Sequence, residues 1–445
     1  MPAPHETRFI MISMAAQAVK YAQRAGADEA EAYCITDRSV SINTKIDHIE
    51  YARESFASGI GIRAIVSGAV GFSSVNHEDD VKRASRLAVT SARASQPDPD
   101  WRALPTPGSY QPVQGVFDRA LAEIELSECV ELAVDMIRGV RSMGAIPTSG
   151  GLAISTSTCH ILNTNGIEHT EQGTMMHLFI ECTMKDGAAI STAHEFGISR
   201  RFDIDASEIG REAARLARES LHGTDMETTR IPVLLGPLAI ADILEYAFIP
   251  SLNADNVQKG RSMLSEIGAQ VASDELTIFD DGLRTAGIGT AESDDEGTPS
   301  QKTVVIEDGV LKRHLHDAYT AGKADTASTG NATRSGYGTT PSVDVRNLVL
   351  NYPASDVIAE TENGVLIHSV IGAHTANHYS GDFSVEARNS FLIENGEVKH
   401  PIKSIMIAGN VFDLLRNIDG AGRDVRAVGE IVVPTLRVSD MRVIG

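Results

Sequence analysis

The chain has 445 residues, 42% hydrophobic and 22% charged, which is ordinary for a water-soluble globular protein with room for two or three domains. Its formal net charge of −21 disfavours direct binding to nucleic acid, because such binding depends on clustered Lys and Arg side chains. No run of about 18 apolar residues occurs, so no membrane-spanning helix is expected.

The N-terminus and the cysteines both favour a cytoplasmic protein. Residues 1–8 lack a basic segment followed by an apolar core, so we expect a short unstructured lead and not a signal peptide. The four cysteines lie far apart in the first half of the chain and form no C-x-x-C pair: Cys34, Cys129, Cys159 and Cys182. This spacing argues against a zinc ribbon and favours reduced, mostly buried thiols.

The first half of the chain alternates between helical and strand patterns. Apolar residues at helical spacing predict helices over 9–25, 79–94, 127–142 and 206–220. Period-two patterns predict strands over 31–35, 39–44, 59–65, 69–74, 150–157, 159–164, 167–184 and 188–198. Turn residues such as Ser67-Gly68, Asn165-Gly166 and Asp186-Gly187 separate neighbouring strands, which predicts antiparallel hairpins.

The second half opens with a buried type of strand from Thr228 to Gly236, followed by a helix over 237–249. Asn395-Gly396 lies between two apolar runs and is the strongest hairpin signal in the chain, since a type I′ turn needs φ > 0 at both central residues. It predicts a hairpin joining 390–393 to 398–407, with Pro401 at an edge position or at the end of a first ladder.

These patterns predict an α+β fold. We expect two mixed α/β domains with largely antiparallel sheets and hairpin meanders. The predicted domains are residues 1–225 and 226–445, with the boundary near 222–230.

The C-terminal block carries a recognisable series of motifs. Gly381-Asp382-Phe383-Ser384 precedes Glu394-Asn395-Gly396-Glu397, and then Ile407-Ala408-Gly409-Asn410. This series resembles the C-terminal signature of the TldD/TldE (PmbA) family of metallopeptidase subunits. The likeness covers roughly residues 10–445 and is closer to the TldE (PmbA) branch. Further agreeing segments are 27–32, 59–63, 71–74, 294–297 and 328–334.

The resemblance raises the question of a catalytic zinc. TldD-type subunits carry H-E-x-x-x-H on the helix after the opening strand of the C-terminal half, and a later cysteine completes the zinc site. The shared pattern Asp255 to Lys259-Gly260 places this motif opposite Glu245–Pro250. Glu245 and Pro250 stand at the two histidine positions and Tyr246 at that of the glutamate. No cysteine follows Cys182, so we expect no metal in this chain and zinc in a TldD-like partner.

A second group of potential ligands lies near the C-terminus. It consists of His368, His374, His378 and Asp382. His374 and His378 have a spacing that would pair them on a helix, but glycines and polar residues around them disfavour a helix. The sequence favours a polar loop and leaves a metal site open. His314 and His316 would share one side of a strand, but no third ligand is near.

The resemblance also indicates which residues would border the substrate tunnel of the family. Segment 328–334 is rich in backbone donors and small hydroxyls, which suit an extended peptide captured by strand addition. The predicted substrate-binding residues are Ser328, Thr329, Gly330, Asn331, Arg334, His374, Asn377, Gly381 and Asp382. We expect the acidic segment 292–297 to form a solvated turn, which in the family lies near the groove between subunits.

The leading functional prediction is a TldE/PmbA-like, non-catalytic subunit that forms a heterodimer with a TldD-like catalytic subunit. The resemblance implies that the assembled metallopeptidase degrades or processes unfolded peptides. The family label "modulator of DNA gyrase" implies an indirect link through peptide substrates. Two alternatives stay open: a self-sufficient metallopeptidase using His374 and His378, and a non-enzymatic homodimeric regulator.

Overall fold

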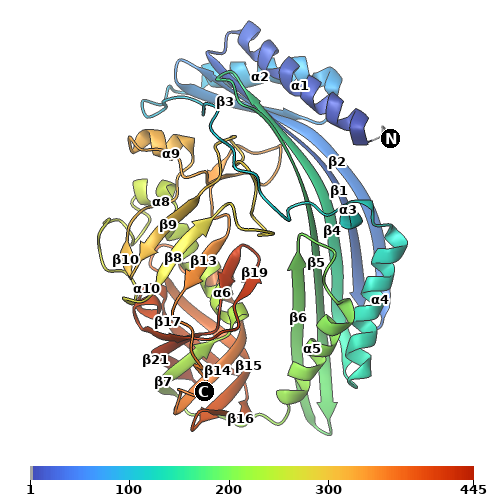
Figure 1. The fold of residues 1–445 in the computed structure, drawn as a ribbon, viewed down its shortest axis with the longest axis vertical. Helices are drawn as coiled ribbons and strands as arrows, with labels where there is room; N and C mark the ends of the chain where they lie inside the picture. Colours follow the sequence, from blue (N-terminus) through green and yellow to red (C-terminus); the bar gives the residue numbers. More distant parts are fainter. Residues whose placement is uncertain (1–3) are drawn as a thin grey trace.

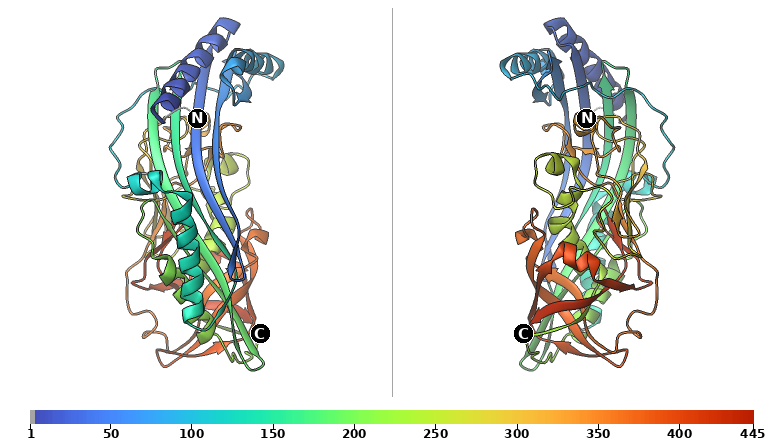
Figure 2. Two further views of the ribbon diagram at one scale, coloured as in Figure 1. Left: turned by 90° about the vertical axis from the view of Figure 1, so that its right-hand side faces the viewer. Right: turned by 90° about the vertical axis from the view of Figure 1, so that its left-hand side faces the viewer.

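The computed structural model describes residues 4–445, with side chains described from Met11 onward. The first half of the chain forms one long, curved antiparallel sheet, and the second half packs against its concave side (Figure 1). Figure 2 shows α4 along the outer face of this sheet in one view and the second half covering the other face in the opposite view.

The first sheet has the strand order β3-β2-β1-β4-β5-β6. Its strands are β1 (Glu29–Lys45), β2 (His48–Val66), β3 (Ala69–Val75), β4 (Ile146–Asn163), β5 (Glu168–Asp186) and β6 (Ala189–Ser199). The breaks expected within β1 and within β4 are wrong, because both ladders continue through Asp37, which pairs with Ala57 and Ser157. The polar residues there keep partners: Arg38 bonds Glu54 at 2.7 Å and the carbonyl of Ile124 at 2.6 Å.

Helices cover only the convex face of this sheet. They are α1 (Pro4–Ala25), α2 (Val81–Ala94) after a short 3-10 turn at Glu78–Asp80, α3 (Arg119–Glu123), α4 (Leu126–Ser142) and α5 (Ala206–Glu219). α1 begins earlier than expected, so residues 4–8 of the predicted lead are helical, while residues 1–3 lie outside the described part. α4 and α5 cross closely, since a Cβ on Gly210 would lie 2.2 Å from the carbonyl oxygen of Met136.

The alternation of side chains along β1 separates the two faces. Cys34 packs among apolar residues of α1 and α2, whereas its neighbour Tyr33 points to the opposite face toward the second half of the chain. All four cysteines are free, and only Cys159 is not fully buried.

The second half contains two main sheets around a shared apolar core. One has the order β14-β7-β21-β17-β15-β16 with β18 paired to β21, and the other has the order β10-β9-β8-β13-β20-β19. The strands are β7 (Thr229–Leu235), β8 (Thr277–Asp281), β9 (Lys302–Glu307), β10 (Val310–Leu311), β13 (Leu348–Asn351), β14 (Asn363–Ile371), β15 (Asp382–Glu394), β16 (Glu397–Ile402), β17 (Ile405–Asn410), β18 (Ile418–Ala421), β19 (Arg426–Val428), β20 (Ile431–Val433) and β21 (Leu436–Ile444). A small hairpin of β11 (Ala332–Thr333) and β12 (Ser342–Val343) stands apart.

Helix α6 (Pro237–Ala247) is buried within this core, and α7 (Ile249–Leu252) follows it directly. The remaining helices are α8 (Ala254–Gln258), α9 (Ala318–Lys323), α10 (Val411–Arg416) and a 3-10 turn at Ala373–Thr375. Pro237 at the first position of α6 suits a helix start, because proline lacks the N–H that would be unpaired there.

The hairpin at Asn395-Gly396 is confirmed, with φ angles of 51° and 75° at these two residues. β16 is the last strand of its sheet, so Pro401 lies on an edge as expected. The run expected to continue to Ile407 is interrupted at Lys403-Ser404, but β16 and β17 both pair antiparallel with β15.

The α+β fold rich in antiparallel pairs is therefore confirmed. The first sheet uses strands only up to Ser199, and the other sheets use strands only from Thr229 onward. The division into domains 1–225 and 226–445 stays a proposal. Over residues 4–445, no helix combines the length and apolar character needed to cross a lipid bilayer.

Candidate functional site

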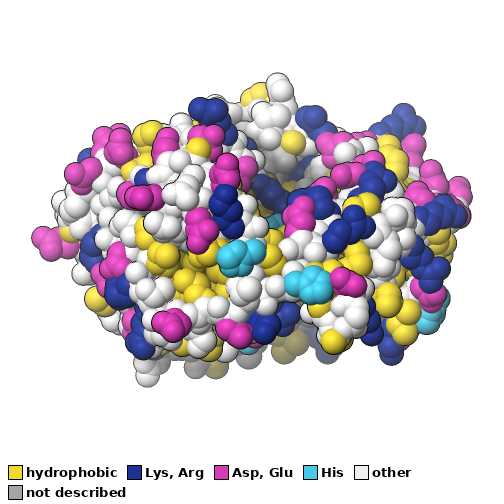
Figure 3. Space-filling view, turned by 90° about the horizontal axis from the view of Figure 1, so that it is seen from below, with side chains coloured by type: hydrophobic (Ala, Val, Ile, Leu, Met, Phe, Trp, Pro, Cys, Tyr) yellow, Lys and Arg dark blue, Asp and Glu magenta, His cyan; other side chains and the backbone are white. Residues whose placement is uncertain are grey.

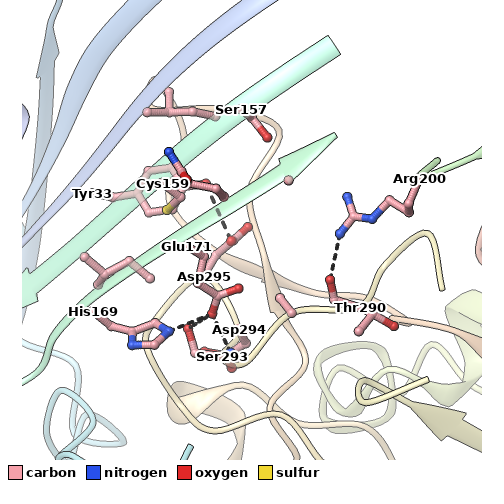
Figure 4. A pocket seen from close by; sticks show the side chains of 15 residues that line it. Tyr33, Ser157, Cys159, His169, Glu171, Arg200, Thr290, Ser293, Asp294 and Asp295 are labelled. Carbon is pink, nitrogen blue, oxygen red and sulfur yellow. Dashed lines mark hydrogen bonds and ion pairs between the residues drawn. The ribbon is translucent and has the colours of Figure 1, made fainter. Parts of the chain in front are cut away.

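Two neighbouring cavities lie between the first sheet and the second half of the chain. The smaller cavity has a volume of about 160 Å³. It is lined by residues of β1, β4 and β5 on the concave face of the first sheet and by the loop 290–295. Its labelled lining residues are shown in Figure 4. The larger cavity has a volume of about 680 Å³ and lies mainly against the second half. Both cavities are lined by Arg200, Thr290, Ala291 and Asp295.

A carboxylate anchors the loop in the smaller cavity. Glu171 on β5 accepts hydrogen bonds from His169 at 2.9 Å, from the backbone N–H of Ser293 at 2.6 Å and from its hydroxyl at 2.9 Å (Figure 4). Burial alone would raise the pKa of Glu171, but the bonds from His169 and Ser293 lower it. Tyr110, from the connecting segment 105–115, stacks on His169 at 4.2 Å. Glu171 therefore holds the two halves together as an ionised acceptor.

The thiol in the same cavity is not an activated nucleophile. Burial raises the pKa of Cys159 well above its ordinary value, and the nearby Asp295 raises it further. Burial likewise raises the pKa of Tyr33. A nucleophilic cysteine needs the opposite shift, toward the thiolate.

The residues predicted to occupy the positions of the zinc motif lie in the wall of the larger cavity. Glu245 and Tyr246 are in the last turn of α6 and Pro250 is in α7, and all three line the cavity. Burial raises the pKa of Glu245, and the nearby carboxylates of Glu430 and Asp344 raise it further.

The residues of this cavity do not fit a zinc ion. Its described lining contains neither histidine nor cysteine, and its carboxylates lack the nitrogen or sulfur ligands of catalytic zinc sites. Across residues whose side chains are described, no group of three or more His, Cys, Asp or Glu could hold a metal.

Arg200 and Arg346 reach the larger cavity from opposite halves of the chain. Arg200 follows β6 and donates to the carbonyl of Thr290 at 2.7 Å, while Arg346 precedes β13 and donates to the carbonyl of Ser293 at 3.4 Å. Neither has an ion pair within 4.0 Å among the described residues, and the Nε atoms of both are buried without a hydrogen-bond partner. Burial, and then the charge of Arg346, lower the pKa of Arg200 to about 10.

An ionic cluster of two arginines and two glutamates lies beside these two arginines, although the Nε of Arg63 is also buried without a hydrogen-bond partner. Arg63 on β2 contacts Glu31 at 2.8 Å and Glu296 at 2.6 Å. Arg334 pairs with the other oxygen of Glu31 and lies over the ring of Tyr33, 4.8 Å from its centroid. The cluster joins the first sheet to the second half of the chain.

The expected solvated turn at 292–297 is wrong. Asp294 and Glu296 are 1% and 0% exposed. Their burial is possible because both carboxylates have hydrogen-bond partners. Glu296 pairs with Arg63, and Asp294 accepts hydrogen bonds from the backbone N–H groups of Glu296, Thr298 and Ala332 at 3.0, 2.9 and 3.1 Å.

The predicted segment 328–334 divides into two parts. Thr329 and Asn331 are buried, and Asn331 donates to Asp280 at 2.7 Å and to the carbonyl of Asp344 at 2.9 Å. Ser328 donates to the carbonyl of His316 at 3.1 Å, and Gly330 has a φ of 72°. Only Arg334 of the predicted substrate-binding residues lines the larger cavity.

The predicted residues of loop 372–382 form an exposed turn beside α10. Asp382 accepts from Ser380 at 2.6 Å and from Asn410 at 2.9 Å, and Asn377 bonds back to Gly381 and Asp382 through its backbone. Gly381 has a φ of 79°, and a Cβ there would lie 2.6 Å from the ring of Phe412.

The histidines of the second ligand group do not converge. His374 packs edge-on against Tyr246 with ring centroids 6.4 Å apart, and His378 lies 3.9 Å from the ring of Tyr379. His368 on β14 faces β6 instead: burial lowers its pKa to about 4 despite the nearby Glu195. His314 bonds the carbonyl of Leu264 at 2.6 Å.

The face seen from below, where the two halves meet, is hollowed between them, and basic side chains lie in the hollow (Figure 3). Sequence reasoning missed Arg200, Arg346 and Glu171, the polar residues that line the cavities. In the sequence, each of them is a charged residue at the end of a strand or on one face of a long strand. Many exposed residues occupy such positions, so the sequence does not single these three out.

Family models cover most of the chain in three consecutive segments. They are PmbA/TldA metallopeptidase domain 1 at residues 30–92, the central domain at 119–221 and the C-terminal domain at 228–445. The chain is 31% identical to an uncharacterized protein of Methanocaldococcus jannaschii, over 92% of this chain and 94% of that protein. It is 29% identical to a metalloprotease of Methanothermobacter thermautotrophicus, over 88% and 87%.

Solved structures agree with these matches. The crystal structure of TldE from Thermococcus kodakarensis superposes with a TM-score of 0.90 at 26% identity, over 97% of this chain and 100% of that one. A putative modulator of DNA gyrase from Thermotoga maritima shares the fold, with a TM-score of 0.89 at 24% identity, over 97% and 99%. The chain belongs to the PmbA/TldD metallopeptidase family, and its sequence motifs and fold are consistent with the TldE branch.

Proposed function

We propose that this chain is the TldE/PmbA-like, non-catalytic subunit of a cytoplasmic TldD/TldE-type metallopeptidase that degrades or processes unfolded peptides. A TldD-like partner subunit would supply the zinc ligands and the glutamate that activates water. This chain would supply part of the wall around the peptide and a surface for the partner.

One observation carries this proposal. Glu245, Tyr246 and Pro250, which the sequence pattern aligns with the H-E-x-x-x-H of TldD-type subunits, line the larger cavity, and its described lining includes no histidine or cysteine. A carboxylate with a raised pKa, a phenol and a proline cannot replace two imidazoles and a thiolate as zinc ligands. The cavity has a volume in the range of small-ligand sites.

The test is to purify this chain and its TldD-like partner separately and to assay cleavage of an unfolded peptide by each alone and by the mixture. We expect cleavage in the mixture and none by this chain alone. Co-elution of the two chains in size-exclusion chromatography would support the heterodimer. A failure to associate, or hydrolysis by this chain alone, would contradict the proposal.

A matched pair of variants locates the chemistry. Tyr246→Phe in this chain, at the position of the motif glutamate, should leave the activity of the mixture within about twofold, whereas replacing the motif glutamate of the partner should abolish it. Metal analysis adds an independent readout: about one tightly bound zinc per chain here, lost on His374→Ala, would favour the self-sufficient metallopeptidase instead.

A further inference from the structure

We propose that Arg200 and Arg346 form a carboxylate-binding pair in the larger cavity, and that the pair holds the C-terminal carboxylate of a short peptide. The inference deepens the proposed function because it names the group by which this subunit would hold a peptide. It concerns the isolated chain, so it does not depend on the partner.

The first argument is the state of the two guanidinium groups. Each makes one hydrogen bond to a backbone carbonyl, at 2.7 Å for Arg200 and 3.4 Å for Arg346. A guanidinium has five N–H donors in a fixed fork, and the Nε donor of each of these two groups is buried without a hydrogen-bond partner. Buried charges in proteins are normally paired.

The second argument is the contrast with the arginines next to them. Arg63 and Arg334 face the same space between the halves, yet both are paired with glutamates. Arg63 and Arg334, which join the two halves, therefore each have a carboxylate partner. Among the described residues, no carboxylate lies within 4.0 Å of Arg200 or Arg346. The planar fork of arginine matches a carboxylate through two parallel hydrogen bonds.

The third argument is the rest of the cavity. Asn253 lines it, donates its amide N–H to the carbonyl of Val343 at 2.9 Å and has a buried amide oxygen without a partner. That oxygen suits a backbone N–H of a peptide. The cavity is also lined by carboxylates that suit a positive group such as an amino terminus: Glu245, Asp295, Asp344 and Glu430. The cavity thus contains both basic and acidic side chains.

The direct test is calorimetric titration of the isolated full chain with three forms of tri-alanine. We expect the free acid and the N-acetylated free acid to bind, and the C-terminal amide to bind at least tenfold more weakly. An N-acetylated, C-amidated Ala-Asp-Ala that binds as well as the free acid would assign the pair to an acidic side chain and overturn the C-terminal assignment.

Variants connect the binding to the pair. Arg200→Met and Arg346→Met should each weaken binding of the free acid at least tenfold, while Arg138→Met, an exposed arginine on α4, should leave it unchanged. Arg346→Lys keeps the charge without the fork, so we expect intermediate binding. Circular dichroism and thermal unfolding confirm that each variant is folded.

The proposal is overturned if the free acid and the amide bind equally, if neither binds at millimolar concentration, or if both methionine variants bind like the unmodified chain. Each of these results is independent of the partner, so a failure here leaves the subunit role standing. A failure to form the heterodimer would leave this binding result intact in turn.

Discussion

Two pairs of arginines face the space between the two halves of this protein, and they differ in what surrounds them. Arg63 and Arg334 lie against Glu31 and Glu296, so their charges are neutralised within the chain. Arg200 and Arg346 meet only carbonyl oxygens. A paired buried charge holds a structure in one arrangement, whereas an unpaired one costs stability and is retained where it has another task.

The largest expected effect is the loss of the central arginine of the paired cluster. Arg63→Met leaves Glu31 and Glu296 buried with too few partners, and we expect the free energy of unfolding to fall by about 3–5 kcal/mol. Urea denaturation measures it. Arg83→Met, at an exposed ion pair with Asp80, is the matched control and should change stability by less than about 0.5 kcal/mol. Equal effects of the two variants would contradict the structural role of the cluster.

His368 shows a third way to bury a basic group, which is to keep it neutral. Burial lowers its pKa from 6.5 to about 4, so between these values the unfolded chain binds a proton that the folded chain does not. Stability contributed by His368 is therefore present above pH 6.5 and decreases as the pH falls toward 4, by up to roughly 3 kcal/mol. His368→Gln should flatten the dependence of unfolding free energy on pH in this window, measured by denaturation at several pH values. An unchanged slope would show that the ring is solvated.

Arg334→Met tests the second arginine of the ionic cluster. Glu31 keeps its contact with Arg63 at 2.8 Å, so the loss should be smaller than for Arg63→Met, about 1–3 kcal/mol. The same urea titrations compare the two variants. A larger loss for Arg334→Met would place the centre of the cluster at Glu31 and not at Arg63.

The smallest expected effect on stability is that of Arg346→Met. Arg346 has no ion pair within 4.0 Å, and its charge only opposes the rise that burial causes in the pKa of Asp295, so we expect a change within about 1 kcal/mol, of either sign. Ligand binding should nevertheless be lost in the same variant. Destabilisation as large as that of Arg63→Met would show that Arg346 is structural and would remove the contrast between the two pairs.

Local patterns determined much of this fold. Asn395-Gly396 and Asp308-Gly309 both adopt positive φ at hairpin turns, because few residue pairs tolerate that conformation. Helices α2, α4, α5 and α6 were predictable from apolar residues at helical spacing. The alternation along β1 also separates the face that packs on helices from the face that lines the cavity.

The tertiary structure alone decided the site. The sequence placed Thr329, Asn331 and the acidic segment 292–297 near solvent or substrate, but most of these polar groups are buried because partners distant in the chain satisfy them. It gave no reason to single out Arg200 or Arg346, since a missing ion pair is visible only when all neighbours are known. The prediction that Glu245, Tyr246 and Pro250 stand at the positions of the zinc motif rests on residue identity alone, because an absent histidine cannot be supplied by folding. Whether a buried charge is paired depends on contacts between residues as far apart as Glu31 and Arg334, and such contacts exist only in the folded chain.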